Sequence, residues 1–164
     1  MDSALAPLWA YDAASAPDNA VPSISLTRLR LRSWRFLPGF VPLTLRSARQ
    51  AERAPGFLDG AVLGEPARLT FWTLTTWTDE AAMRAYLLSG VHRAAMPRLL
   101  DWCDEAAVAR WEAAEAALPG WAEADRRLRE VGRPSKVRHP SPDHAGLRHA
   151  PPSLTRGARL RPRG

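Results

Sequence analysis

The chain has 164 residues, of which 46% are hydrophobic, and a formal net charge of +6 at pH 7. This length predicts one folded domain, and no apolar run reaches the ~18 residues that a membrane-spanning helix requires. A secretory signal begins with basic residues, whereas residues 1–20 contain no Lys or Arg. Cys103 is the only cysteine, which excludes an internal disulfide and fits a reducing compartment. We therefore expect a cytoplasmic protein without a membrane partner.

The basic residues are concentrated near the C-terminus. Residues 132–164 contain eight Lys or Arg, one acid and six prolines. This composition predicts a basic tail that is largely disordered or extended. Nucleic acid is not the expected partner, because no aromatic residues are interleaved with the basic ones. Residues 1–20 lack periodicity and predict a flexible N-terminal arm, which leaves residues 21–131 for the folded domain.

The first predicted element is a strand over residues 23–33, where apolar and polar side chains alternate. The alternation places Ile24, Leu26 and Arg28 on one face and Leu29 and Leu31 on the other. The next segment, residues 34–42, is expected to form a structured loop.

A helix is expected to follow that loop. Pro42 suits its first turn, and Pro55-Gly56 should end it near Ala54. The arginines of this helix predict a solvated face; they are Arg46, Arg49 and Arg53.

Two strands and two helical segments come next. Residues 57–63 and 68–77 predict strands, the second being rich in Thr, Trp and Phe. Thr78 is expected to cap a helix with acids in its first turn. A second helical segment follows Ser89-Gly90, and a spacing of four residues places His92 and Met96 on its apolar face.

The segment 105–118 fits two structures. Its alanines favour a helix, but residues 106–111 also alternate as a strand would. After Pro119, a final amphipathic helix is predicted, with Trp121, Ala124 and Leu128 on one side.

The order strand, helix, strand, strand, helix, doubtful strand is the βαββαβ order of a ferredoxin-like α+β fold. Within it, Pro55 to Phe57, Thr75 to Trp77 and Ser89 to Ala95 resemble the sequence pattern of the antibiotic biosynthesis monooxygenase superfamily. The resemblance covers about residues 23–112 and indicates a bacterial branch distantly related to haem-degrading monooxygenases. It implies a four-stranded antiparallel sheet with helices on one face, and a strand over 105–111.

The resemblance also implies a homodimer. In this superfamily the second face of the sheet meets that of a partner, which closes a dimeric α+β barrel, and each subunit has a cavity between its sheet and its helices. A small hydrophobic or aromatic ligand is expected there. The implied function is monooxygenase-like, on an aromatic or isoprenoid small molecule of secondary metabolism. Two alternatives stay open, namely a haem-binding protein and a non-catalytic ligand-binding barrel, so haem is one candidate cofactor and enzymatic activity is not decided.

His92 is the first candidate catalytic residue, as a haem ligand or as an acid/base near pH 7. The alternative is a structural histidine bonded to a backbone carbonyl. Alignment with the haem-degrading members places Met96 at their iron ligand, Tyr86 at a tryptophan and Arg28 near an asparagine. The resemblance therefore does not imply their haem-degrading reaction, and Arg28 stays a candidate for holding a substrate anion.

Aromatic side chains are the remaining candidates. Trp34 and Trp72, with Tyr86 and Met96, are predicted to line a ligand pocket, and the alternative is packing in the core or between subunits. No metal site is predicted, because the tail histidines are five residues apart on a Pro-rich segment. Cys103 is expected to be structural, because the neighbouring acid Asp104 does not activate a thiolate.

Overall fold

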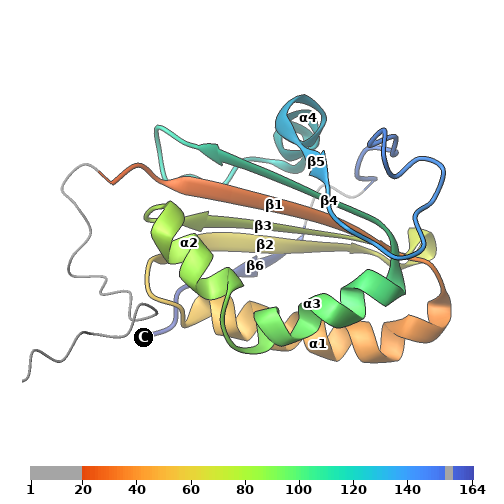
Figure 1. The fold of residues 1–164 in the computed structure, drawn as a ribbon. Helices are drawn as coiled ribbons and strands as arrows, with labels where there is room; N and C mark the ends of the chain where they lie inside the picture. The colour runs from red at the N-terminus through yellow and green to blue at the C-terminus, as the bar shows by residue number, and fades with distance from the viewer. Residues whose placement is uncertain (1–19, 154–156) are drawn as a thin grey trace, which may run out of the picture.

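The computed structural model describes residues 20–153 and 157–164, so the predicted N-terminal arm lies, except for Ala20, outside the described residues. Six antiparallel strands form one sheet in the order β5-β4-β1-β3-β2-β6 (Figure 1). The four central strands are β1 (Ser23–Leu31), β2 (Phe57–Glu65), β3 (Thr70–Trp77) and β4 (Cys103–Glu112). The segment 105–111 is thus a strand, as the resemblance implied.

The predicted number of four strands is wrong, because two short strands extend the sheet at its edges. Strand β5 (Arg133–Pro134) pairs with β4, and β6 (Ala158–Leu160) pairs with β2. Both come from the C-terminal residues, whose basic, Pro-rich composition gives no strand signal. They cover backbone groups that an edge strand would otherwise expose.

Three helices cover one face of the sheet (Figure 1), namely α1 (Leu37–Glu52), α2 (Glu80–Leu87) and α3 (Gly90–Trp102). Helix α1 begins earlier than predicted: Pro38 occupies its first turn, where a missing N–H is harmless, and Pro42 lies inside the helix. Asp79, and not Thr78, caps α2, because its carboxylate accepts the N–H of Ala82 at 2.8 Å. Within the described residues, no helix is long and apolar enough to cross a membrane.

The opposite face of the sheet is covered by the chain's own C-terminal part. Helix α4 (Trp121–Val131) packs Trp121, Ala124 and Leu128 against a core that includes Leu26 and Trp72. The predicted amphipathic helix is confirmed. The expectation that the second face of the sheet is left bare for a partner subunit is wrong. The homodimer stays a prediction, and it no longer has that bare face as its reason.

The residues after α4 lie along the domain and include turns over residues 142–147. Ser135 donates its N–H to the carbonyl of Ala106 at 2.8 Å, and Arg138 forms an ion pair of 2.8 Å with Asp101. Near the C-terminus, Arg163 pairs with Glu52 at 2.7 Å. Carboxylates of the domain thus pair with arginines of the C-terminal residues, and the disordered or extended tail stays a prediction.

Candidate functional site

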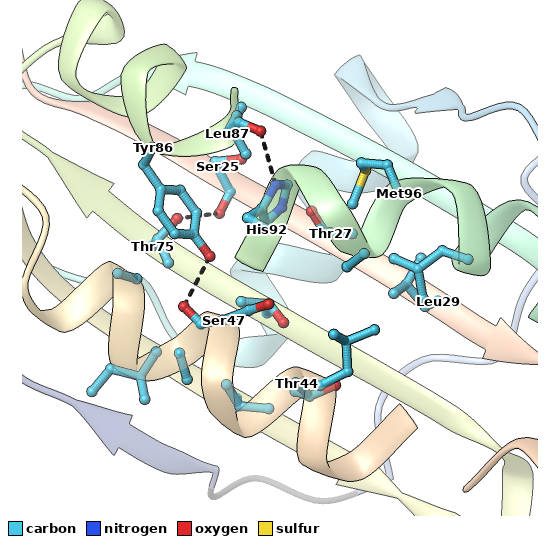
Figure 2. A pocket seen from close by; sticks show the side chains of 18 of the residues that line it. Ser25, Thr27, Leu29, Thr44, Ser47, Thr75, Tyr86, Leu87, His92 and Met96 are labelled. Carbon is cyan, nitrogen blue, oxygen red and sulfur yellow. Dashed lines mark hydrogen bonds between the residues drawn. The ribbon is translucent and has the colours of Figure 1, made fainter. Parts of the chain in front are cut away.

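A cavity of about 100 Å³ lies between the sheet and helices α1 and α3 (Figure 2). Period-two alternation directs Ser25, Thr27 and Leu29 of β1 toward it, and Leu26 and Arg28 toward the opposite face. Most of the lining is apolar, with hydroxyls from the strands and from α1. The principal lining side chains are Ser25, Thr27, Thr44, Ser47, Thr75, Tyr86, His92 and Met96.

His92 lies in the first turn of α3 and reaches the cavity. Its Nδ1 is 3.1 Å from the carbonyl oxygen of Leu87, and a carbonyl only accepts hydrogen bonds. Nδ1 therefore carries the proton and Nε2 has the free lone pair. Burial lowers the pKa of His92, the Leu87 carbonyl opposes that shift, and the positive charge of Arg110 lowers the pKa further. At neutral pH the ring is thus an uncharged proton acceptor.

The position of His92 is fixed by Gln50 and Tyr86. The backbone N–H of His92 donates to Oε1 of Gln50 at 3.0 Å, while Nε2 of Gln50 donates to the carbonyl of Ser89 at 3.0 Å. The ring of Tyr86 packs against the imidazole with 4.9 Å between centroids. In the described part of the chain, no group forms a hydrogen bond with Nε2 of His92, so this atom is available to a ligand.

Tyr86 lines the cavity with its ring, whereas its hydroxyl is engaged in a hydrogen bond. The hydroxyl donates to the carbonyl oxygen of Ser47 at 3.1 Å (Figure 2). Burial raises the pKa of Tyr86 well above its usual value, so the phenol stays neutral. The ring also stacks on Trp77 with centroids 5.0 Å apart, which makes it a rigid wall.

Hydroxyl groups of the strands form the polar part of the cavity. Thr75 donates to the carbonyl of Ser25 at 3.4 Å and accepts the indole N–H of Trp77 at 3.0 Å. Met96 lines the cavity from α3, and because it is 40% exposed the cavity reaches the surface beside it. The hydroxyls of Thr27, Thr44 and Ser47 were not predicted to belong to the site. The signal that could have indicated them is a polar residue on the inward-facing side of a predicted strand or helix.

Arg28 and Trp72 lie on the other face of the sheet, so the predicted grouping of Arg28 with His92, and of Trp72 with Tyr86, is wrong. Arg28 is buried, pairs with Glu105 at 2.7 Å and lies 5.6 Å from the ring centroid of Trp72. Trp72 is fully buried beneath the C-terminal residues. Alternation correctly placed Arg28 opposite Thr27, but it could not tell which of the two faces the cavity occupies.

Trp34 does not line the cavity either. Its side chain is 57% exposed in the short helical turn η2 (Trp34–Phe36) before α1. Cys103 is buried, and burial, with the charge of Asp104 as a second cause, raises the pKa of its thiol to about 12. That thiol is therefore unreactive near neutral pH, in agreement with a structural role.

The sheet order and the helices on one face define the class of the protein: it has the α+β fold of the antibiotic biosynthesis monooxygenases. One crystal structure named as such a monooxygenase aligns with a TM-score of 0.51 and 13% identity, over 57% of this chain and 99% of its own. A Nitrosomonas europaea protein assigned to the same group aligns with a TM-score of 0.52 and 12% identity, over 58% and 92%. A conserved protein of Methanosarcina mazei aligns at 0.50 and 16%, over 56% and 92%.

The chain belongs to the family DUF3291, a domain of unknown function, whose model matches residues 35–138. That match includes α1 to α4 and the cavity residues from Phe40 to Leu99. Among curated protein sequences, none matches this chain. The fold is thus known from the comparisons, and the chemistry has to be inferred from the cavity.

Proposed function

We propose that this chain is a monooxygenase-like protein that binds a small aromatic or isoprenoid molecule in the cavity and removes a proton from it with Nε2 of His92. The observation that supports this is the free Nε2 of a neutral, oriented imidazole in a largely apolar cavity. A neutral imidazole is a competent general base near pH 7. Burial of the site favours a ligand that is mostly apolar and carries one hydroxyl or other acidic proton.

The size of the cavity limits the ligand. An apolar cavity of ~150 Å³ holds one benzene ring, whereas this cavity encloses about 100 Å³. At most a single ring or one isoprenoid unit of the ligand is therefore expected to enter. Larger ring systems require movement of Met96, whose exposed, unbranched side chain can change rotamer at little cost.

Deprotonation of the ligand is the first step of the proposed chemistry. A phenol or enol that loses its proton becomes electron-rich at the adjacent carbon, and such an anion can itself reduce O₂. When a CH₂ group of the substrate becomes a carbonyl, one oxygen atom enters the product and the other leaves as water, so the substrate supplies all four electrons. After proton transfer, the imidazolium of His92 would stabilise the anion by charge.

Haem does not fit the cavity in this conformation. Its macrocycle is several times larger than the benzene ring that ~150 Å³ accommodates, and among the described lining residues none is a Lys or Arg that would pair with its propionates. Nε2 of His92 is a chemically suitable ligand for iron, but the surrounding space is not. We therefore derive no step through haem.

The same lack of cationic lining residues favours a second candidate, a ligand-binding protein without turnover. His92 is the only group of the described lining that can become positively charged. A site that stabilises an anionic transition state usually offers several preorganised donors, and here Tyr86 and Thr75 already donate to backbone carbonyls. This candidate predicts binding of the same ligands without consumption of O₂.

The test combines binding and oxygen uptake. Binding of 4-nitrophenol, which has one ring and whose neutral and anionic forms absorb differently, is followed by difference absorbance. Uptake of O₂ is followed with a panel of one-ring and two-ring phenols and enols that carry a CH₂ group able to become a carbonyl. His92→Gln should retain part of the binding and lose about 10²–10⁴-fold in uptake rate, the usual contribution of a general base.

His139→Ala is the matched control, because His139 is exposed and lies outside the cavity. Uptake that is the same in wild type and His92→Gln would rule out the acid/base role. Binding by the wild type with no uptake for any substrate of the panel would select the second candidate.

A further inference from the structure

A second concave surface, which we call the arginine groove, lies between α1 and the turn that joins α2 to α3. It is an open groove of about 1010 Å³. Two arginines of α1 and the arginine that caps its C-terminal end line it, at positions that share one helix face because they are spaced three and four residues apart. The fourth comes from α3, so the set is Arg46, Arg49, Arg53 and Arg93.

The charges of the arginine groove are not neutralised by the protein. Some other surface arginines pair closely with acids, as Arg84 does with Glu80 at 2.6 Å and Arg138 with Asp101 at 2.8 Å. The isolated Arg98, in contrast, pairs with none of the described acids. Within the described residues, the four arginines of the groove have no carboxylate within ion-pair distance, and the groove lining contains no acid. Like charges spaced three or four residues apart on a helix repel each other, so an anion bound between them would be stabilised.

Arg93 is the least expected member of the set. Cations are favoured at the C-terminal end of a helix, which accounts for Arg49 and Arg53 near the end of α1. Arg93 lies in the first turn of α3, where the helix dipole disfavours a positive charge. Local helix energetics therefore do not account for Arg93, whereas an anion shared with the arginines of α1 does.

Part of the groove lining is apolar, and we call this part the floor. Leu88 lines the groove and is 69% exposed, which is a large exposed fraction for a leucine. Small and apolar residues continue the floor; they are Ala54, Ala82, Ala85 and Val91. A surface with a cationic rim and an apolar floor is complementary to an amphipathic anion.

The arginine groove adjoins the cavity of His92. Tyr86 lines both of them, and Gln50, which lines the groove, accepts the backbone N–H of His92 at 3.0 Å. An apolar chain that lies on the groove floor therefore meets Tyr86, the wall of the cavity.

We infer that the arginine groove binds the carboxylate or phosphate end of an amphipathic organic anion, with its apolar part on the Leu88 floor and directed toward Tyr86. Guanidinium groups suit both anions, because they donate paired hydrogen bonds to them. The inference rests on the proposed function only for the direction of the apolar part. Binding of the anion itself does not require His92 to act as a base.

The experiment compares three ligands that share one alkyl chain, by calorimetry on the whole 164-residue chain: octanoate, octyl phosphate and 1-octanol. We expect at least one anion to bind about tenfold more tightly than octanol, which corresponds to about 1.4 kcal/mol, and more weakly as salt is raised. Which of the two anions binds better distinguishes a carboxylate ligand from a phosphate ligand. Inorganic phosphate should bind more weakly than octyl phosphate, because it leaves the apolar floor empty.

Variants locate the site. The double variant Arg49→Gln/Arg53→Gln should lose about tenfold in anion affinity and none in octanol affinity. Arg98→Gln is the matched control, because Arg98 is also exposed on α3 but does not line the groove. Circular dichroism checks that each variant is folded.

Three results would overturn the inference. They are octanol binding as tightly as both anions, the double variant binding anions like the wild type, and binding to vesicles of anionic phospholipid without binding to octyl phosphate. The last result would assign the arginines to a membrane surface. His92→Gln should keep its octanoate affinity, so a failure of the proposed base chemistry is distinguishable from a failure of the anion site.

Discussion

His92 and Arg28 show how one residue's surroundings decide its chemistry. Both are polar side chains that lie against the sheet, but on opposite faces. His92 has one ring nitrogen bonded to Leu87 and the other free, whereas Arg28 is buried and held by Glu105 at 2.7 Å. The first arrangement suits a site that exchanges protons with a ligand, and the second suits a fixed structural pair.

The pH dependence of stability should report the state of His92. Its pKa in the folded chain is lowered by burial, while in the unfolded chain it is near the ordinary ~6.5. Between these two values the unfolded chain binds a proton that the folded chain does not, so the free energy of unfolding rises with pH across this window. Urea unfolding of wild type and His92→Gln at a series of pH values checks this: the wild type should lose stability relative to the variant below about pH 6.5. Parallel profiles would contradict it.

Replacing Arg28 should destabilise the fold. Arg28→Met leaves Glu105 buried without its closest partner, although Arg30 at 3.0 Å and the hydroxyl of Ser141 at 2.9 Å remain. Because removal of one member of a buried pair costs 3–5 kcal/mol, we expect a loss of about 3 kcal/mol in urea unfolding. The double variant Arg28→Met/Glu105→Gln should recover part of that loss. Arg98→Met, at an exposed position, is the control and should change stability by less than about 0.5 kcal/mol.

At the scale of elements, His149 connects the C-terminal residues to α4 and the sheet. Its Nε2 is 2.9 Å from a carboxylate oxygen of Asp125 on α4, its Nδ1 is 2.9 Å from the carbonyl of Leu147, and its ring meets Trp72 edge-on at 5.6 Å. One buried side chain thus fixes three segments of the chain to one another.

We expect His149→Ala to loosen the residues that lie over this face without unfolding the sheet. Loss of a buried hydrogen bond to a charged group costs ~1.5–3 kcal/mol, and Asp125 keeps its ion pair with Arg129 at 3.0 Å. Limited trypsin digestion followed by mass spectrometry should show faster cleavage after Arg138 and Arg148 in the variant. His139→Ala, at an exposed residue, should digest like the wild type, and equal digestion of all three proteins would show that His149 does not hold this segment.

The elements differ in how far the sequence predicts them, for physical reasons. Strand β1 was predictable because alternation is a local property, and β4 required the family resemblance because its alanines favour a helix. The two short edge strands were not predictable, since β6 depends on pairing with β2 rather than on its own residues. Likewise, the tail residues looked unstructured because the pairing of Arg163 with Glu52 joins positions far apart in the chain.

The residues of the candidate site also differ in how far the sequence predicts their positions. His92 and Met96 were predicted from their four-residue spacing to share one helix face, and both line the cavity together with Tyr86 of α2. Arg28 and Trp72 were misplaced because alternation gives two faces without identifying the covered one. The arginines of α1 read as a solvated face, and only the position of Arg93 across the groove suggests a ligand.

At the scale of the whole molecule, α4 and the C-terminal residues occupy the sheet face that would pair two subunits in a dimeric barrel. Apart from the buried pair of Arg28 and Glu105, that face is apolar and includes Ile24, Leu26, Trp72 and Leu74, each at most 2% exposed beneath its cover. Burial of apolar area stabilises the folded chain by roughly 25 cal/mol per Å², which holds the covering segments in place. A partner subunit would reach this face of the sheet only after displacing them.

We therefore expect that removing the cover changes the oligomeric state. A chain that ends at residue 117 lacks α4 and everything after it, and should expose that sheet face and self-associate. Light scattering should then give a larger number of subunits for the shortened chain than for the full chain, whose subunit mass is 18.1 kDa.

Leu128→Asp in the full chain tests the same face by a second route, because a buried charge at that position should displace α4 and also promote association. If both variants keep the subunit number of the full chain while staying folded, the covered face has no tendency to pair. A full chain that is already a stable dimer with α4 in place would have to associate through a different surface, and Leu128→Asp would then add further subunits to that dimer.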